Sequence, residues 1–332
     1  MDPNLRTPYT YQYNLSIQHE LPDNLVLQTA YVGTASHKLT ALMDVNPFDP
    51  KTLGGTPHRI QNEVAGNTDK SFGFLEEFRN TSDASYNGLQ ISVTKPLSPT
   101  RFLGNTYFTL AYTYAHNIDN ASGFRETSST VPFFQPHIFR ASSDIDLRHV
   151  FAFSGGWDLP FNRGPEKLVK GWSLYPIITY RTGYPLSVTA DLSTSQSVPG
   201  PSGAGDASLV NANLVGPIQY FDPHLQQTFG AAKGLFLFNP KAFDNSSPTP
   251  PYGTAARNLL RGPHRANMDF ALAKATPVYG ERVNVEFRAE AFNIFNHTQF
   301  RSVGTNPDST TFGQVTSAYD PRILQFGLHI KF

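Results

Sequence analysis

The sequence predicts an all-β fold, in the form of a fragment of an antiparallel transmembrane β-barrel. Three observations lead to this prediction. Apolar and polar residues alternate strictly over many segments, a pattern typical of strands with one apolar and one polar face. Several segments exceed the usual globular strand of about five or six residues and suit tilted strands that cross a bilayer. Short and long connections alternate between these segments.

The composition excludes several other classes of protein. The chain has 332 residues, with 26 Lys and Arg against 26 Asp and Glu, and no cysteine. Balanced charge argues against a nucleic-acid partner, because binding to phosphates requires an excess of Lys and Arg. The lack of cysteine excludes disulfide scaffolds, thiolate metal sites and a cysteine nucleophile. No apolar run is long enough for a transmembrane helix.

The alternation is clearest at the two ends of the chain. In residues 9–21, Tyr, Leu and Ile side chains share one face and Thr, Gln, Asn and Ser side chains the other. In residues 324–332, Leu, Phe and Ile alternate with Gln, Gly, His and Lys in the same way. Together with weaker copies between them, the pattern predicts nine strands, over residues 9–21, 25–34, 89–94, 107–114, 151–159, 172–180, 268–272, 282–291 and 324–332.

The connections favour a barrel over a soluble sandwich. Tight links are expected at 22–24, 98–103, 161–169 and Gly280, and long loops at 36–84, 117–146, 183–264 and 297–319. Structureless loops of this length are uncommon in compact soluble domains. Outer-membrane barrels, in contrast, have short periplasmic turns and long extracellular loops.

The aromatic residues are placed as two belts would require. Five tyrosines are expected near the loop ends of their strands, and three aromatic residues near the short-turn ends: Tyr9, Tyr11, Tyr13, Tyr112 and Tyr114, and then Trp157, Trp172 and Phe332. Amphipathic rings settle at the headgroup level of a bilayer, so two such belts flank the apolar band of a lipid-facing barrel.

Five stretches of the chain carry a resemblance to a known family. They are Ser85–Lys95 (SYNGLQISVTK), Ala111–Asn120, Asp146–Phe151 (DLRHVF), Asn258–Pro263 (NLLRGP) and Phe287–Phe300 (FRAEAFNIFNHTQF). In this order and spacing, the sequence resembles the C-terminal part of TonB-dependent outer-membrane receptors, specifically the Oar-like group with a carboxypeptidase-regulatory-like N-terminal domain. The resemblance covers nearly the whole chain.

The resemblance implies a location, a domain organisation and a function. Members of this family have a signal peptide, a plug domain that contacts TonB, and a barrel of about 22 strands. We therefore expect residues 1–332 to be a partial barrel domain without plug and signal peptide, located in the bacterial outer membrane. The implied function is to bind and admit an extracellular solute. The expected partners are outer-membrane lipid, the barrel-assembly machinery, an unknown extracellular ligand and, only through a missing plug, the TonB system.

Two groups of residues are candidates for specific roles. Five charged residues are expected to face the lumen, where they would contact a plug, line a permeation path or form cross-strand ion pairs: Asp269, Arg282, Glu286, Arg288 and Glu290. The apolar residues of the last strand resemble the terminal signal read by the barrel-assembly machinery: Phe326, Leu328, Ile330 and Phe332.

Signals for an enzyme are poor, so no catalytic residue, cofactor or metal is expected. The spacing of His137, Asp144, Asp146 and His149 matches no compact metal-ligand motif, which favours solvated loop residues. The loop at 183–264 contains aromatic residues that would form a cap over the barrel mouth or bind a ligand: Phe236, Phe238, Phe243 and Tyr252.

Two alternatives to a receptor fragment remain open at the level of the sequence. One is a secreted all-β adhesin or carbohydrate-binding module whose apolar faces form a sandwich core. The other is a small passive porin. Because an open sheet leaves backbone groups unpaired in lipid, we expect this chain alone not to insert as a functional pore.

Overall fold

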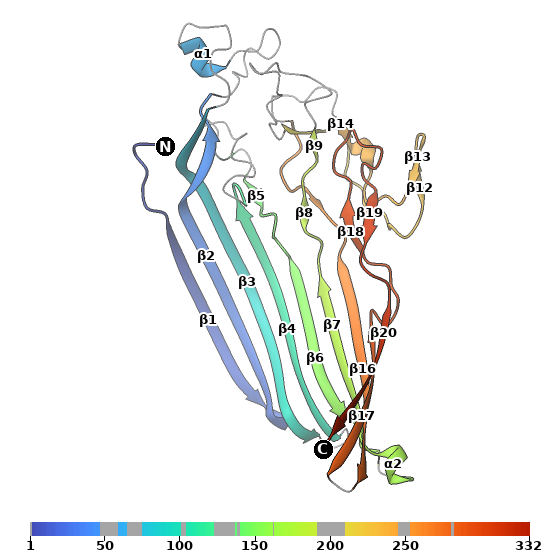
Figure 1. Cartoon of the computed structure of the whole chain (residues 1–332). Helices are drawn as coiled ribbons and strands as arrows, with labels where there is room; N and C mark the ends of the chain where they lie inside the picture. The colour runs from blue at the N-terminus through green and yellow to red at the C-terminus, as the bar shows by residue number, and fades with distance from the viewer. Residues whose placement is uncertain are drawn as a thin grey trace.

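The fold is a single long, curved sheet with irregular segments gathered at one end (Figure 1). It is seen in a computed structural model of the whole chain. The structure describes residues 2–46, 59–64, 75–100, 104–122, 137, 140–161, 163–190, 210–244, 253–279 and 282–332.

Nine long strands follow one another across the sheet, and each pairs antiparallel with its neighbours. They are β1 (Tyr9–Leu21), β2 (Leu25–Asp44), β3 (Glu76–Thr100), β4 (Gly104–Asp119), β6 (His149–Asp158), β7 (Trp172–Arg181), β16 (Arg265–Tyr279), β17 (Val283–Phe292) and β20 (Ile323–Lys331). The short strand β5 (Ala141–Ser142) adds to the end of β4. The predicted all-β antiparallel fold with nine long strands is confirmed.

The register separates apolar from polar side chains across the whole sheet. One lateral row on one face consists of Leu27, Val93, Leu110, Phe153, Ile178 and Met268. The adjacent row on the other face consists of Gln28, Ser92, Ala111, Ala152, Thr179 and Asn267. Because successive side chains of a strand point to opposite faces, these rows define an apolar face and a polar face of the sheet.

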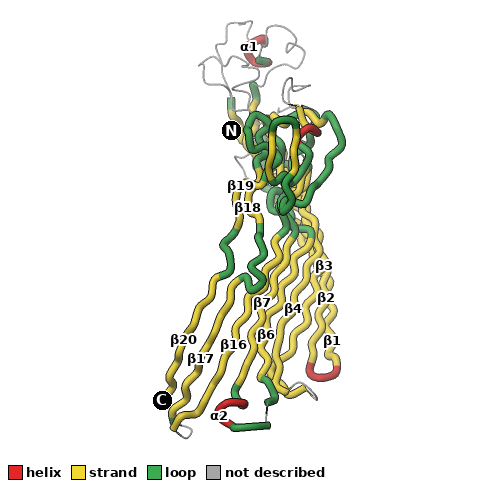
Figure 2. Tube along the Cα trace, turned by 90° about the vertical axis from the view of Figure 1, so that its right-hand side faces the viewer, coloured by secondary structure: helices red, strands yellow, loops and turns green. Residues whose placement is uncertain are grey.

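No second sheet covers the apolar face in the part of the chain that the structure describes. Leu15 and Ile17 are 67% and 65% exposed, and Leu89, Phe287 and Phe326 are exposed as well. Figure 2 shows the strands in side view as one layer. The sheet therefore lacks the core that a β-sandwich forms between two layers.

Short and long connections lie at opposite ends of the sheet, as expected (Figure 2). The 3-10 turn η1 (Pro22–Asn24) joins β1 to β2 with Asp23 at φ 61° and Asn24 at φ 58°. Asp and Asn tolerate this left-handed conformation better than other residues with a side chain. The helix α2 (Glu166–Val169) lies at the same end, and α1 (Ile60–Val64) lies among the long loops. No helix in the described ranges is long and apolar enough to cross a membrane.

Two of the predicted loops are shorter than the sequence suggested. β2 continues to Asp44 and β3 begins at Glu76, so much of the 36–84 segment is paired strand. β4 likewise continues to Asp119, inside the predicted 117–146 loop. These extensions were missed because strict alternation of apolar and polar residues does not continue into them, and residues 76–84 are mostly polar.

The predicted 183–264 loop is wrong as a structureless segment. Together with 297–319 it contains short strands: β8 (Pro185–Leu186), β9 (Thr189–Ala190), β10 (Val210–Asn211), β11 (Asn213–Leu214), β12 (Gln227–Phe229), β13 (Ala232–Gly234), β14 (Phe243–Asp244), β15 (Leu260–Arg261), β18 (Phe300–Val303) and β19 (Val315–Ala318), and the 3-10 turn η3 (Pro240–Ala242). We call the described residues of 183–264 and 297–319 the cap.

The cap contains its own apolar core. Phe238 is fully buried and contacts Phe243 and Phe312 edge-on, with ring centroids 5.8 and 5.5 Å apart. Val188, Ala212, Leu237, Ala242, Ala255 and Leu260 complete this cluster. Of the predicted cap aromatics, Phe236 and Phe243 are buried too, and Tyr252 lies outside the described residues. Their burial indicates a folded cap and explains why long loops can hold one shape.

The aromatic residues of the sheet lie where the belts were expected. Tyr9, Tyr11 and Tyr13 lie at the loop end of β1, and Tyr13 stacks on Tyr31 of β2. Trp157 lies near the short-turn end of β6, and Trp172 begins β7 at that end. Between these belts the apolar face consists mainly of Leu, Ile, Val, Phe and Met side chains.

Candidate functional site

Four of the five predicted lumen residues lie on the polar face of the sheet. The register places Glu290, Arg288 and Glu286 of β17 opposite Ala271, Ala273 and Ala275 of β16, on the same face as Asp269. Arg282 lies in the turn before β17, outside the paired register, and is exposed. The predicted charge ladder is therefore one residue shorter than expected, because the strand begins at Val283.

These charged residues form ion pairs or hydrogen bonds with other charged residues or with the nearby backbone. Arg288 Nε donates to Glu290 Oε1 over 2.6 Å, and its guanidinium lies 5.1 Å from the centre of the Tyr175 ring. Lys331 Nζ on β20 lies 3.4 Å from Glu286 Oε2. Pairs of this kind keep the polar face hydrated and do not converge on one point, so they form no discrete site.

Asp269 helps to hold the conformation of the segment that follows β17. Its Oδ1 accepts hydrogen bonds from the backbone N–H of Asn293 (2.8 Å) and from Asn267 Nδ2 (2.7 Å). Asn293 and Asn296 have φ values of 51° and 50°, a conformation that Asn adopts more readily than most residues. The two asparagines of the NIFNHTQF stretch thus shape the turn by which the chain leaves the sheet for the cap.

The residues of the predicted assembly signal lie on the apolar side of β20. Phe326, Leu328 and Ile330 are exposed there, and Phe326 stacks on Phe287 of β17 at 6.2 Å. Phe332 follows the end of the strand and is exposed. Their role in barrel assembly stays a prediction.

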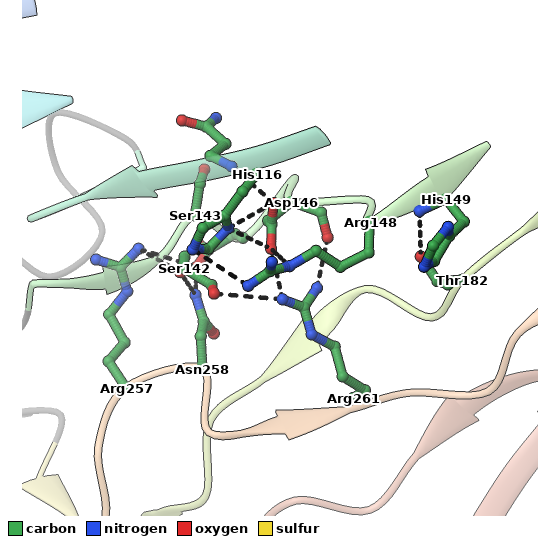
Figure 3. A network of polar contacts seen from close by, with 12 residues as sticks. His116, Ser142, Ser143, Asp146, Arg148, His149, Thr182, Arg257, Asn258 and Arg261 are labelled. Carbon is green, nitrogen blue, oxygen red and sulfur yellow. Dashed lines mark hydrogen bonds and ion pairs between the residues drawn. The ribbon is translucent and has the colours of Figure 1, made fainter. Parts of the chain in front are cut away.

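The cap is held to the loop end of the sheet by a network of charged residues around Asp146 (Figure 3). Asp146 lies between β5 and β6, and its side chain is only 1% exposed. Its carboxylate accepts hydrogen bonds from Arg261 Nη2, Arg148 Nε (3.2 Å), His116 Nδ1 (3.2 Å) and the backbone N–H of Asn117 (2.7 Å). The expectation of a solvated loop residue is wrong for Asp146, because these donors allow a carboxylate to be buried.

The state of His116 follows from its partners. Arg148 Nη2 donates to His116 Nε2 over 3.1 Å, so that nitrogen carries no proton. Nδ1 then carries the proton and donates to Asp146. The imidazole thus bridges an arginine and a carboxylate.

The pKa of the Asp146 carboxyl is lowered by this environment. Burial raises the pKa, but the hydrogen bonds from Arg261, Asn117 and His116 outweigh it. A lowered pKa in the folded state means that the network contributes stability above the unfolded pKa of about 4. This contribution is lost as the pH falls through the folded pKa.

We therefore expect the cap to detach from the loop end of the sheet in acid. Limited digestion with pepsin is expected to cut residues 140–148 and 255–262 much faster as the pH falls below about 4, the unfolded pKa, and through the lowered folded pKa of Asp146. The variant Asp146→Asn should lose most of this acid-dependent step and be cut faster at the upper end of the range. Equal acid dependence in both proteins would contradict a role for Asp146.

A second, more deeply buried ion pair lies beside the first. Arg257 in the cap and Asp119 at the end of β4 pair directly, with side chains 4% and 6% exposed. Arg257 also donates to Ser122 Oγ (3.1 Å) and to the backbone oxygen of Ser142 (3.3 Å). Asn258, at φ 55°, donates to the same oxygen of Ser142 over 2.7 Å.

These contacts bring together segments that lie far apart in the sequence. The stretches DLRHVF, NLLRGP and the end of Ala111–Asn120 meet where Asp146, Arg261, Arg257 and Asp119 lie. Each contributes charged groups whose partners are on another segment. We interpret this cluster as the anchor of the cap, not as a catalytic site, because its charged groups are occupied with one another. Among the described residues, no group of three or more metal-binding side chains occurs.

A pocket of about 380 Å³ opens between the cap and the polar face of the sheet. Arg181 lies at the end of β7, and Tyr184 follows it in the cap. β18 contributes Phe300 and Arg301, and Tyr319 lies at the end of the cap before β20. Arg181 Nη2 donates to the Tyr319 hydroxyl over 3.1 Å. This pocket could not be predicted from the sequence, since most of its residues come from segments without periodicity.

Arginines and tyrosines stack against each other around the pocket. The guanidinium of Arg265 lies 4.3 Å from the centre of the Tyr319 ring, and that of Arg301 lies 5.8 Å from the same ring. Arg181 lies 4.5 Å from the centre of the Tyr184 ring. The negative face of an aromatic ring attracts a cation that lies over it in this way.

Gly183 allows two segments of the cap to approach each other at this pocket. A Cβ atom at Gly183 would lie 1.8 Å from the backbone oxygen of Gly262. The backbone N–H of Gly262 donates to the backbone oxygen of Tyr184 over 2.8 Å, and this hydrogen bond joins the two segments. A side chain at Gly183 would separate them, so glycine is required for this close contact.

Comparisons with known proteins agree with the geometry of the sheet. Residues 1–325 match the protein family described as "Outer membrane beta barrel domain". Among solved structures, the chain is similar to the outer membrane transporter YddB from Escherichia coli, with 9% sequence identity and a TM-score of 0.48. That match covers 98% of this chain and 33% of the transporter, so the chain spans about a third of its length. No curated protein matches the chain.

Proposed function

The chain belongs to the outer membrane β-barrel domain family, and from this premise we propose that it forms part of the barrel of a TonB-dependent receptor of the Oar-like group. The family places the chain in the bacterial outer membrane, with the apolar face of its sheet toward lipid. The proposed activity is to bind an extracellular solute at the cap and to admit it through the barrel.

The observation that carries the proposal of a larger barrel is the direction of the two edge strands. The nine long strands alternate in direction, so β1 and β20 run the same way. Direct pairing of these edges would be parallel, whereas bacterial barrels are closed by antiparallel pairs and have even strand numbers. An odd number of further strands would close the sheet and satisfy the backbone groups that both edges leave unpaired in lipid.

The cap supports a receptor over a simple pore. Its apolar core and its anchors through Asp146 and Arg257 give it a defined shape next to the polar face. Ordered loops on a rigid scaffold are the usual position of recognition sites. In this proposal a plug domain would lie against the polar face, near Asp269, Glu286, Arg288 and Glu290, and would connect the receptor to the TonB system.

Fractionation of the native bacterium tests the location and the barrel. We expect the protein in the outer membrane, extracted only by detergent, and migrating differently on a gel before and after heating, as folded barrels do. Release into buffer without detergent would favour the secreted adhesin or carbohydrate-binding module instead. If the 332-residue chain alone formed a stable heat-modifiable pore in vesicles, the larger barrel would be contradicted in favour of a small porin.

Capture by TonB tests the receptor class. The detergent-extracted native protein is expected to be retained on a column that carries the C-terminal domain of TonB. A heat-modifiable barrel that passes through this column would contradict TonB dependence.

A further inference from the structure

We propose that the pocket lined by Arg181, Tyr184, Phe300, Arg301 and Tyr319 binds an anionic group, a carboxylate or a phosphate, that is attached to a flat apolar or aromatic part of a solute. This inference rests on the proposed function, because it names the class of solute that the receptor would take at its cap.

The first argument is an excess of positive charge without a counter-charge. Arg181 and Arg265 occupy directly opposite positions on β7 and β16, and Arg301 reaches the same tyrosine ring as Arg265. Like charges directly opposite each other destabilise a sheet. None of the ion pairs among the described residues involves these three arginines, whereas Arg257 and Arg261 of the cap are paired with Asp119 and Asp146.

The second argument is unused hydrogen-bonding capacity. Arg265 Nε is buried and has no hydrogen-bond partner. A buried donor without a partner is costly, so such a group in a native protein calls for an explanation. An anion in the pocket would supply a counter-charge for Arg181 and Arg301, which line it, and for Arg265, which stacks on the lining residue Tyr319. The planar fork of a guanidinium matches carboxylate and phosphate oxygens.

The third argument concerns the rest of the solute. Tyr184 is exposed at the pocket, and Phe300 and Tyr319 provide two further rings on its lining. Flat aromatic surfaces beside cationic groups favour a ligand with both an anionic end and a flat apolar part. A neutral saccharide would use the rings but leave the three positive charges uncompensated, so an anion is the occupant that the pocket favours.

Calorimetric titration tests this inference. The native protein is purified from detergent-extracted outer membranes and titrated with phenyl phosphate, and separately with benzoate, inorganic phosphate and neutral benzyl alcohol. We expect phenyl phosphate or benzoate to bind, with inorganic phosphate weaker and benzyl alcohol weakest. The difference between the first two probes distinguishes a phosphate from a carboxylate. Binding should weaken with added salt, because screening reduces attraction between charges.

Matched variants separate the pocket from general surface charge. Arg301→Gln removes one charge from an exposed side chain of the pocket, and we expect its Kd for the binding anion to rise about tenfold, the equivalent of one lost charge-assisted hydrogen bond. Arg301→Lys keeps the charge and should retain part of the affinity. Arg163→Gln removes an exposed arginine at the short-turn end of the sheet and should leave the Kd unchanged.

The outcomes for the pocket and for the receptor are distinguishable in the same samples. A heat-modifiable protein that binds benzyl alcohol or a neutral sugar as tightly as the anions would overturn the anion site and leave the barrel intact. So would an equal loss of affinity in Arg163→Gln and Arg301→Gln. A protein that is extracted without detergent would overturn the proposed function itself.

Discussion

Replacing Arg257 by alanine is expected to release the cap from the sheet, with a loss of about 3–5 kcal/mol in the stability of that contact. The reason is that Asp119 would remain buried without its positive partner. Arg257 is 4% exposed and Asp119 6% exposed, so water cannot replace the lost guanidinium without opening the contact. Hydrogen exchange followed by mass spectrometry is the measurement, because it reports residues 253–262 and 140–146 separately from the strands.

Two controls make this prediction specific. In Lys167→Ala, an exposed residue of α2 at the opposite end of the sheet, exchange in the cap should not change. A double variant, Arg257→Leu with Asp119→Leu, should recover part of the protection, because it removes the buried charge together with its partner. Unchanged exchange in Arg257→Ala would contradict the role of this pair as an anchor.

A charge on the apolar face is expected to destabilise the barrel far more than the same charge one residue away. Leu110 of β4 lies between Val93 and Phe153 on the apolar face, and Thr109 faces the other way between Thr94 and Ser154. Leu110→Arg is expected to cost about 2–4 kcal/mol, the penalty for Arg near the middle of a bilayer. Thr109→Arg should cost little, because its side chain enters the hydrated polar side.

Urea unfolding of the protein in phospholipid vesicles measures both variants. The pair is closely matched, since the two residues are neighbours on one strand and receive the same side chain. Similar losses in the two variants would show that both faces of β4 lie in similar surroundings, contrary to our interpretation of the sheet.

Most of the sheet could be predicted from the sequence, because its two faces lie in different solvents. Alternation of apolar and polar residues located all nine long strands, and the predicted short links lie where neighbouring strands join on one side of the sheet. Outside the apolar band the alternation of apolar and polar residues stops, and with it the evidence for a strand. The extensions of β2 to Asp44 and of β3 from Glu76 could not be predicted, since those segments lack a strict alternation of apolar and polar residues.

The interior of the cap could not be predicted for a different reason. Phe238, Phe243 and Phe312 pack together although they come from separate irregular segments. Phe243 lies in a two-residue strand, and Phe238 and Phe312 lie outside the named strands, so no period is long enough to detect. The sequence indicated only that aromatic residues were concentrated there.

The candidate sites also divide into features that a local sequence pattern predicts and contacts that it does not. The positions of Asp269, Glu286, Arg288 and Glu290 on the polar face of the sheet follow from counting along a strand. The pairing of Asp119 with Arg257 joins residues 138 positions apart, which no local pattern reveals. Both residues lie in or next to stretches that carried the family resemblance, so those stretches marked the anchor without identifying its contacts.

The central claim is that the apolar face of the sheet contacts acyl chains, and nitroxide labels on adjacent residues test it most directly. The chain has no cysteine, so Ile178→Cys and Thr179→Cys each provide a single labelling site. In membranes, the label at 178 is expected to collide mainly with dissolved oxygen, which concentrates in lipid, and the label at 179 mainly with a water-soluble nickel chelate. A label at 178 that is shielded from both reagents, or that is reached by the nickel chelate as readily as the label at 179, would contradict the account.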